Sequence, residues 1–213
     1  EYSAQQICSY FAQDTGVTMS YVVDGGEAYD GNSTIISLGK TSAYNTAVKN
    51  HKKVDVSRET LNDDGFVMFT DGKSLFIDGY NDRGIMYGAF EFIEQNLGVK
   101  FLTYDYTYVP TVTQVVLKGY DKTYVSPFRQ RVYLNTPIWY KDTDYVAHMR
   151  YNTDFCNMPE NMGSSTKWSY YGSGGDATHT GFRIVVPSDY METVDGVTRI
   201  KSEYVDCFSH TGS

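Results

Sequence analysis

The sequence predicts a small α+β domain, a mixed sheet with packed helices, followed by an incomplete (β/α) barrel segment. The first observation is the stretch 65–102, where two short apolar runs flank Asp71-Gly72 and a helical pattern follows. The second is a change after Ser126 to a strand–helix–strand pattern, which is typical of a βα unit. We therefore assign residues 1–123 to the α+β domain and residues 124–213 to the first βα units of a truncated TIM-type barrel, since a complete barrel takes about 250 residues.

The first 64 residues alternate between helical and strand patterns. Residues 2–14 predict an amphipathic helix that ends at Gly16, and its apolar face holds Ala4, Ile7, Cys8 and Phe11. Alternating apolar residues predict strands over 17–23 and 34–38. The polar stretch 40–64 is expected to hold a short helix and a loop.

The stretch 65–102 is the expected packing core. Asp71-Gly72 suits a type I′ turn, because both of its residues tolerate positive φ. Asn81 or Asp82 can cap the following helix, whose apolar face recurs at helical spacing at Met86, Phe90, Ile93 and Leu97. Gly84 and Gly88 lie one turn apart, which would let this helix approach a sheet closely. Gly98 is expected to be a left-handed C-terminal cap, and a strand is predicted over 99–102.

The remaining elements lead into the barrel segment. A strand is predicted over 112–117 and a linker over 119–126. Beyond the linker, the pattern predicts three strands and one helix, with the strands over 128–134, 153–157 and 182–186 and the helix over 142–151.

Composition excludes several classes of function. Hydrophobic residues make up 41% and charged residues 21%, as in ordinary globular proteins. The net charge of −8 argues against a nucleic-acid partner, because phosphate binding needs a basic face. The longest apolar run, Phe66 to Phe69, is far shorter than the roughly 20 residues that span a bilayer, so no membrane span is expected. The 20 tyrosines suit either sugar contact or exposed strands, and composition does not choose between them.

No motif indicates a metal, a cofactor or a nucleophilic enzyme. The three cysteines, at positions 8, 156 and 207, form no CxxC pair, and the 4 histidines are not clustered. The sequence contains no HExxH, no GxSxG, no P-loop and no GxGxxG. We therefore expect no cofactor and no metal.

One combination of residues resembles a known domain. In chain order, the combination consists of a strand that begins with GF, a DG turn, a strand that ends in I-x-G, the pattern RG-x-x-YG-x-x-x-x-x-E and the pattern LG-x-x-F. In this sequence the matching residues are Gly65, Phe66, Ile77, Gly79, Arg83, Gly84, Tyr87, Gly88, Glu94, Leu97, Gly98 and Phe101. It resembles the small, zincin-like α+β domain that precedes the barrel in α-glucuronidases, in family 20 β-N-acetylhexosaminidases and in a bacterial group of unassigned activity.

The resemblance extends to the opening of the barrel and implies candidate sugar contacts. Arg131 matches an arginine that reaches the sugar from the first barrel strand, although an ion pair with an inner-barrel carboxylate is an equal alternative. Trp139 and Trp168 fall in the first two predicted βα loops, where they could stack on a pyranose or pack on the preceding domain. His179 follows a Gly-rich loop, and a structural or solvated role is the simpler interpretation.

The expected activity is glycoside hydrolysis, but no catalytic residue is assigned. Such hydrolysis needs two carboxylates, and no spacing marks a pair among Asp154, Glu160 and Asp176. The resemblance implies the N-terminal portion of a carbohydrate-active enzyme that acts on a poly- or oligosaccharide, with this portion inactive by itself. The alternative is a non-catalytic carbohydrate-binding or cell-surface module. An extracellular or cell-surface location is expected, although Glu1-Tyr2-Ser3 shows no secretory signal, and the oligomeric state is left open.

Overall fold

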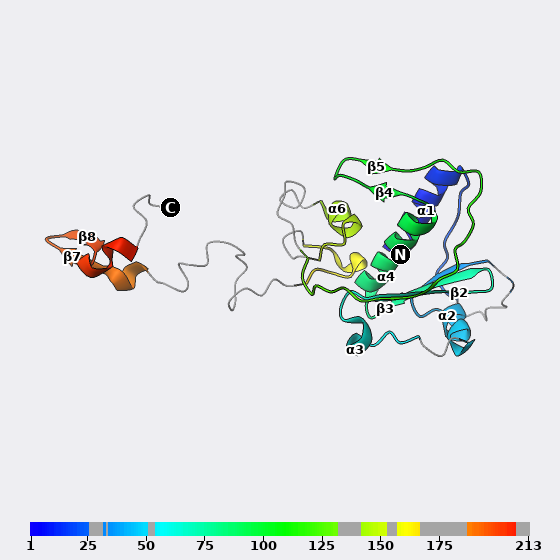
Figure 1. The fold of residues 1–213 in the computed structure, drawn as a ribbon, viewed down its shortest axis with the longest axis horizontal. Helices are drawn as coiled ribbons and strands as arrows, with labels where there is room; N and C mark the ends of the chain where they lie inside the picture. The colour runs from blue at the N-terminus through cyan, green and yellow to red at the C-terminus, as the bar shows by residue number, and fades with distance from the viewer. Residues whose placement is uncertain are drawn as a thin grey trace. The chain divides into compact units, whose positions relative to one another are not determined.

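In the computed structural model, the described residues are 1–25, 32, 34–50, 54–131, 142–152, 157–166 and 187–207. The chain divides into two compact units, Glu1–Lys167 and Trp168–Ser213 (Figure 1). Within the described ranges, no helix is long and apolar enough to cross a membrane.

A mixed four-stranded sheet forms the centre of the first unit, in the order β1-β3-β2-β6. The strand β1 (Ile36–Leu38) runs parallel to β3 (Ser74–Gly79). The strand β2 (Phe66–Asp71) is antiparallel to both β3 and β6 (Asp121–Tyr124). The predicted α+β class with a mixed sheet is therefore confirmed.

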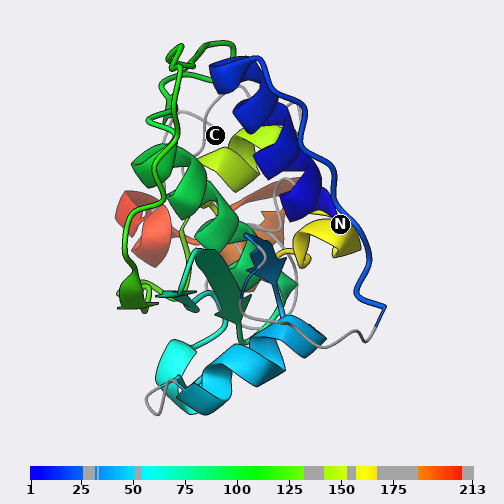
Figure 2. The ribbon, with the colours of Figure 1, turned by 90° about the vertical axis from the view of Figure 1, so that its right-hand side faces the viewer.

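Helices cover both faces of this sheet (Figures 1 and 2). On one face α4 (Asp82–Asn96) packs against the strands, with α1 (Tyr2–Thr15) beside it. The opposite face carries α2 (Ser42–Ala47), which continues into the 3₁₀ turn η1 (Val48–Asn50). The short helix α3 (Arg58–Leu61) leads into β2.

The alternation of side chains along β2 and β3 explains the two cores. Phe66 and Met68 of β2 pack with α4, whereas Phe69 packs with Tyr44 of α2. Phe76 of β3 joins Phe69, and the two rings stack with centroids 5.2 Å apart. Because both faces are covered, the run from Phe66 to Phe69 is apolar at every position.

The caps of α4 are those that the sequence predicts. Asn81 is the N-cap residue, and its side-chain oxygen accepts a hydrogen bond of 3.1 Å from the amide of Gly84. At the other end Gly98 has a φ of 77°, which is the left-handed cap conformation. The helix therefore starts and stops on local signals.

The predicted turn at Asp71-Gly72 is displaced by one residue. Asp71 still pairs with Ser74 in the ladder, so Gly72 and Lys73 are the central residues. Gly72 has a φ of 57°, whereas Lys73 has no positive φ, and glycine at the first central position suits a type II′ turn.

Smaller elements complete the first unit. The strands β4 (Lys100–Phe101) and β5 (Thr107–Tyr108) form a separate two-stranded sheet. They are followed by α6 (Thr143–His148) and the 3₁₀ turn η2 (Glu160–Met162). Apolar side chains from these last segments join the core under α4: Val146, Ala147, Met158 and Met162.

The second unit contains one described hairpin. The strands β7 (Met191–Val194) and β8 (Val197–Ile200) are antiparallel. Their turn residues, Asp195 and Gly196, both have positive φ, at 53° and 78°, as a type I′ turn requires. The 3₁₀ segments η3 (Pro187–Tyr190) and η4 (Ser202–Cys207) flank the hairpin.

Several predicted strands are wrong. Residues 17–23 form no strand, and their alternating apolar side chains are not buried: Val22 and Val23 are 89% and 88% exposed. Residues 112–117 also form no strand, whereas the predicted linker 119–126 contains β6. Residues 128–131, the described start of the first predicted barrel strand, are irregular.

The predicted boundary between residues 123 and 124 stays a prediction, as does the barrel assignment of residues 124–213. The described part of 124–166 packs within the first unit. The strands predicted over 153–157 and 182–186 lie almost entirely outside the described residues.

The close approach of α4 to the sheet gives a first prediction. A side chain at Gly88 would meet the side chains of Ile77 and Phe66. Gly88→Leu should therefore lower the free energy of unfolding by roughly 1–3 kcal/mol, as overpacking does. Gly119→Leu is the control, because a Cβ at Gly119 meets nothing within 4 Å. Equal urea-unfolding midpoints for the two variants would show that Gly88 does not lie at a tight contact.

The stacked histidine of α6 gives a second prediction. The rings of His148 and Phe101 are stacked at 4.2 Å, and Phe90 meets His148 edge-on at 4.9 Å. Burial lowers the pKa of His148 to about 4, against the opposing effect of Asp144. Because the unfolded chain binds this proton near pH 6.5, stability is fully present above that pH and falls as the pH decreases toward 4, by at most about 3 kcal/mol.

His148→Phe keeps a ring in place and removes the titration. The stability difference between pH 7 and pH 5, measured by urea unfolding, should therefore be smaller in this variant than in the parent. An unchanged difference would assign the acid sensitivity to other groups.

Candidate functional site

A buried carboxylate, Asp64, lies where the chain passes from α3 into β2. Its side chain is only 4% exposed. One oxygen, Oδ1, accepts a hydrogen bond of 2.5 Å from Nε of Arg83. The other, Oδ2, accepts bonds of 2.6 Å from Nη2 of Arg131 and from Nδ2 of Asn152. We call these four residues the Asp64 cluster. A buried charge is tolerated only when it is paired and hydrogen-bonded in this way.

Arg83 links Asp64 to the segment after η2. It lies in the first turn of α4, and its side chain is 5% exposed. Nη1 donates to the carbonyl oxygen of Ser164 at 2.6 Å, and Nη2 donates to Oγ1 of Thr166 at 2.8 Å. The guanidinium therefore joins residues that lie more than 80 positions apart.

Arg131, the predicted sugar contact, is engaged within the protein. Its Nε donates to the carbonyl oxygen of Arg150 at 2.7 Å, and Nη1 donates to Oγ of Ser126 at 2.7 Å. Its charge also lies 5.5 Å from the ring centroid of Tyr87. Arg131 therefore pairs with a carboxylate of the predicted α+β domain. Both roles predicted for Arg131, sugar contact and an ion pair with an inner-barrel carboxylate, stay predictions.

Tyr87 links the Asp64 cluster to the hydrophobic core. Its hydroxyl donates to the carbonyl oxygen of Tyr151 at 3.0 Å. Burial raises the pKa of Tyr87, and the charge of Asp64 adds to that effect. The phenol therefore stays neutral and acts as a hydrogen-bond donor.

A second ion-pair network lies along α4. Nη2 of Arg150 is 2.9 Å from a carboxylate oxygen of Glu91 and 2.5 Å from one of Glu94. Lys122 of β6 also pairs with Glu91. Burial raises the pKa of Glu91, but the hydrogen bond from Lys122 and the charge of Arg150 outweigh it, and the net shift is downward. Glu91 therefore stays charged and holds β6 and the segment after α6 to the helix.

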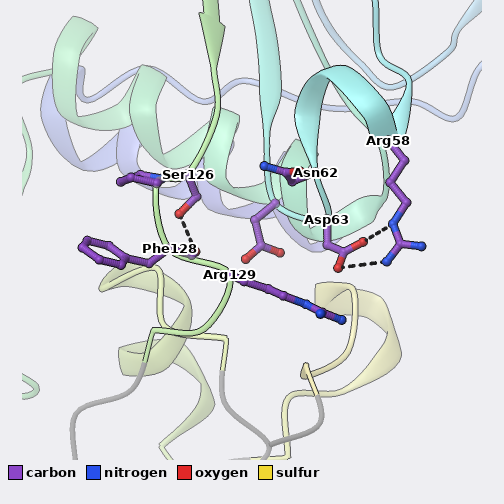
Figure 3. Close-up of a pocket in the computed structure, with 8 residues that line it drawn as sticks. Arg58, Asn62, Asp63, Ser126, Phe128 and Arg129 are labelled. Carbon is purple, nitrogen blue, oxygen red and sulfur yellow. Dashed lines mark hydrogen bonds and ion pairs between the residues drawn. The ribbon is translucent and has the colours of Figure 1, made fainter. Parts of the chain in front are cut away.

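A cavity of about 360 Å³ lies beside Asp64 (Figure 3). We call it the Arg129 cavity, and its lining residues are Arg58, Asn62, Asp63, Asp64, Ser126, Pro127, Phe128 and Arg129. Arg58 and Asp63 pair through two hydrogen bonds, of 2.8 Å from Nε and 3.3 Å from Nη2. The side chain of Arg129, the second arginine that lines the cavity, extends beneath this pair. The ring of Phe128 points to the opposite side.

The other predicted site residues are not brought together in the described ranges. Trp139, Trp168 and His179 lie outside the described residues, as do two of the three considered carboxylates, Asp154 and Asp176. The third, Glu160, is exposed at the start of η2. No group of three or more His, Cys, Asp or Glu side chains that could hold a metal occurs within the part of the chain that the structure describes.

The Asp64 cluster was not predicted as a site. Arg83 belongs to the residues that carry the resemblance, but its partner Asp64 lies in a polar run that reads as a loop. The arrangement positions segments of the chain and is not suited to proton transfer, because both carboxylate oxygens already accept hydrogen bonds from arginine or asparagine.

The comparison with protein families agrees with the resemblance in the sequence. Residues 13–92 match the family described as Glycosyl hydrolase family 67 N-terminus. This match covers fewer than half of the 213 residues and spans α2, the β2–β3 hairpin and most of α4. No curated protein and no solved structure matches the chain. The match confirms a resemblance to the N-terminal domain of α-glucuronidases and supports a module related to glycoside hydrolases.

Removing the charge of Asp64 gives a third prediction. Asp64→Asn leaves Arg83 buried without a counter-charge, so the free energy of unfolding should fall by about 3 kcal/mol or more. The matched control is the neighbouring Asp63→Asn, which removes a more exposed pair and should cost at most about 1 kcal/mol. Thermal or urea unfolding checks both variants. Similar losses in the two would contradict a supporting role for the Asp64 cluster.

Proposed function

We propose that this chain is the N-terminal portion of a carbohydrate-active enzyme, a glycoside hydrolase that acts on a poly- or oligosaccharide. The observation that carries the proposal is the match of residues 13–92 to the family 67 N-terminal domain. The mixed sheet with helices on both faces is consistent with such a module.

The Asp64 cluster suggests what the module does in that enzyme. Two of its members, Arg131 and Asn152, lie in the segment where the sequence predicts the opening of a barrel, and both bond to Asp64. The amide of Arg131 also donates to Oδ1 of Asn152 at 2.8 Å. The module would thereby fix the start of the barrel at a defined position. Its role is to support the catalytic domain.

The proposed reaction needs two carboxylates on either side of the glycosidic bond, about 5–5.5 Å or 6.5–9.5 Å apart. Asp64 does not suit either role, because its oxygens are occupied. We propose that the catalytic pair comes from the barrel, so that residues 1–213 alone are inactive. Arg131, Trp139, Trp168 and His179 are the proposed sugar contacts, and an extracellular or cell-surface location suits a polymeric substrate.

One feature favours the alternative of a non-catalytic carbohydrate-binding or cell-surface module. Three tyrosines around β5 alternate in sequence and are all exposed: Tyr104 at 61%, Tyr106 at 55% and Tyr108 at 48%. Exposed aromatic rings can stack on sugar rings. A binding module would use such a surface without any carboxylate pair.

Hydrolysis is the test, and it gives a fourth prediction. The longer protein that contains this chain should release reducing ends from a panel of plant and bacterial polysaccharides, whereas residues 1–213 should release none. Trp139→Ala in the longer protein should raise the KM, because a stacking contact contributes about 1 kcal/mol. If the longer protein binds the glycans but cleaves none, the binding-module alternative replaces the enzyme.

A further inference from the structure

We propose that the Arg129 cavity binds the anionic group, a carboxylate or a sulfate ester, of an acidic saccharide. The choice of a saccharide rests on the proposed function, whereas the choice of an anion rests on the charges of the cavity.

The charges that line the cavity are balanced, unlike those of the whole chain, which carries a net charge of −8. Two guanidinium groups, those of Arg58 and Arg129, and two carboxylates, those of Asp63 and Asp64, line the wall. Asp63 pairs with Arg58, and Asp64 pairs with the buried Arg83 and with Arg131. Because both carboxylates are engaged by other arginines, the charge of Arg129 favours an anion at the cavity.

Three of the four arginines, Arg58, Arg83 and Arg131, pair with a carboxylate, whereas Arg129 has no such partner within the described ranges. Arg83 and Arg131 pair with Asp64, and Arg58 pairs with Asp63. Among the residues that the structure describes, no carboxylate pairs with Arg129, whose side chain is exposed. A guanidinium forms two parallel hydrogen bonds to a carboxylate, and it also binds phosphate-like groups. Arg129 is therefore the group that can take an external anion.

The backbone at Arg129 is held in place by the Asp64 cluster. The carbonyl oxygen of Arg129 accepts a hydrogen bond of 2.8 Å from Nδ2 of Asn152. Nearby, Oγ of Ser126 donates to the carbonyl oxygen of Phe128 at 2.9 Å. An anchored backbone lowers the cost of ordering the side chain when a ligand binds. The cavity volume of about 360 Å³ lies at the lower end of the range for small-ligand sites, about 300–1,000 Å³.

Arg58 provides a second cation whose availability is set by Asp63. The Arg58 side chain is 57% exposed and that of Asp63 is 25% exposed. A bound anion would compete with Asp63 for Arg58. Removing the charge of Asp63 should therefore strengthen anion binding, whereas removing the charge of Arg129 should weaken it.

The experiment is a titration of residues 1–213, followed by NMR chemical shifts, with tetragalacturonate, neutral galactotetraose and a sulfated carrageenan tetrasaccharide. Tetragalacturonate or the sulfated oligomer should bind at least tenfold more tightly than the neutral one. Arg129→Gln should weaken that binding about tenfold, and Asp63→Asn should strengthen it. The matched control, Arg199→Gln, removes an exposed arginine of the second unit that pairs with Glu192 and should change nothing.

The outcomes separate the two proposals. Equal affinity for neutral and acidic oligomers, or an equal loss in Arg129→Gln and Arg199→Gln, overturns the anion site and leaves the proposed hydrolysis untouched. Binding of free sulfate alone, with no saccharide bound, also overturns it, as an adventitious ion only. Selective binding without hydrolysis by the longer protein supports the site and contradicts the enzyme. The preference between the two acidic oligomers identifies the anionic group.

Discussion

The first unit depends on one buried charge. Asp64 is almost completely removed from water, and a carboxylate in that position is stable only when donors surround it. Those donors come from the start of α4, from Arg131 and from Asn152. The adjacent residue, Gly65, lies at the point where α4 meets the sheet, because a Cβ on Gly84 would clash with the carbonyl oxygen of Gly65. The close contact of α4 with the sheet is therefore made directly beside the pairing of Asp64 with Arg83.

The features that could be predicted well from the sequence are those that depend on residues close together in the chain. The helix α4 begins directly after Asn81 and ends before Gly98, because both caps depend on local residues. The Asp64 cluster could not be found in this way, because Arg131 and Asn152 lie 67 and 88 residues from Asp64. Apolar alternation also failed at 17–23, since a strand needs a partner as well as a pattern. Conversely, β6 has little apolar character and forms because its backbone pairs with β2.

The two Asp-Gly pairs show where a turn motif stops being informative. Asp195-Gly196 occupies the two central positions of its hairpin, whereas Asp71-Gly72 is shifted so that Asp71 stays in the ladder. In the first hairpin, the register predicted from an Asp71-Gly72 turn and the observed register differ by two residues in cross-strand pairing. Such a shift keeps every side chain on the same face of the sheet. The pattern of apolar residues therefore could not distinguish the two registers. The prediction of a turn was correct, but the predicted turn type was wrong.

The distribution of arginines connects stability with the proposed binding. Arg83 and Arg131 both pair with the buried carboxylate of Asp64, so removing either arginine would leave that buried charge with fewer partners. Arg131, a proposed sugar contact, therefore also has a structural role in the first unit. Arg129 is two residues away, and its carbonyl oxygen is bound by Asn152 of the same cluster. In the part of the chain that the structure describes, no buried carboxylate pairs with its guanidinium. The buried carboxylate of Asp64 thus gives Arg83 and Arg131 their structural role. Through Asn152, the same cluster also holds the backbone of Arg129.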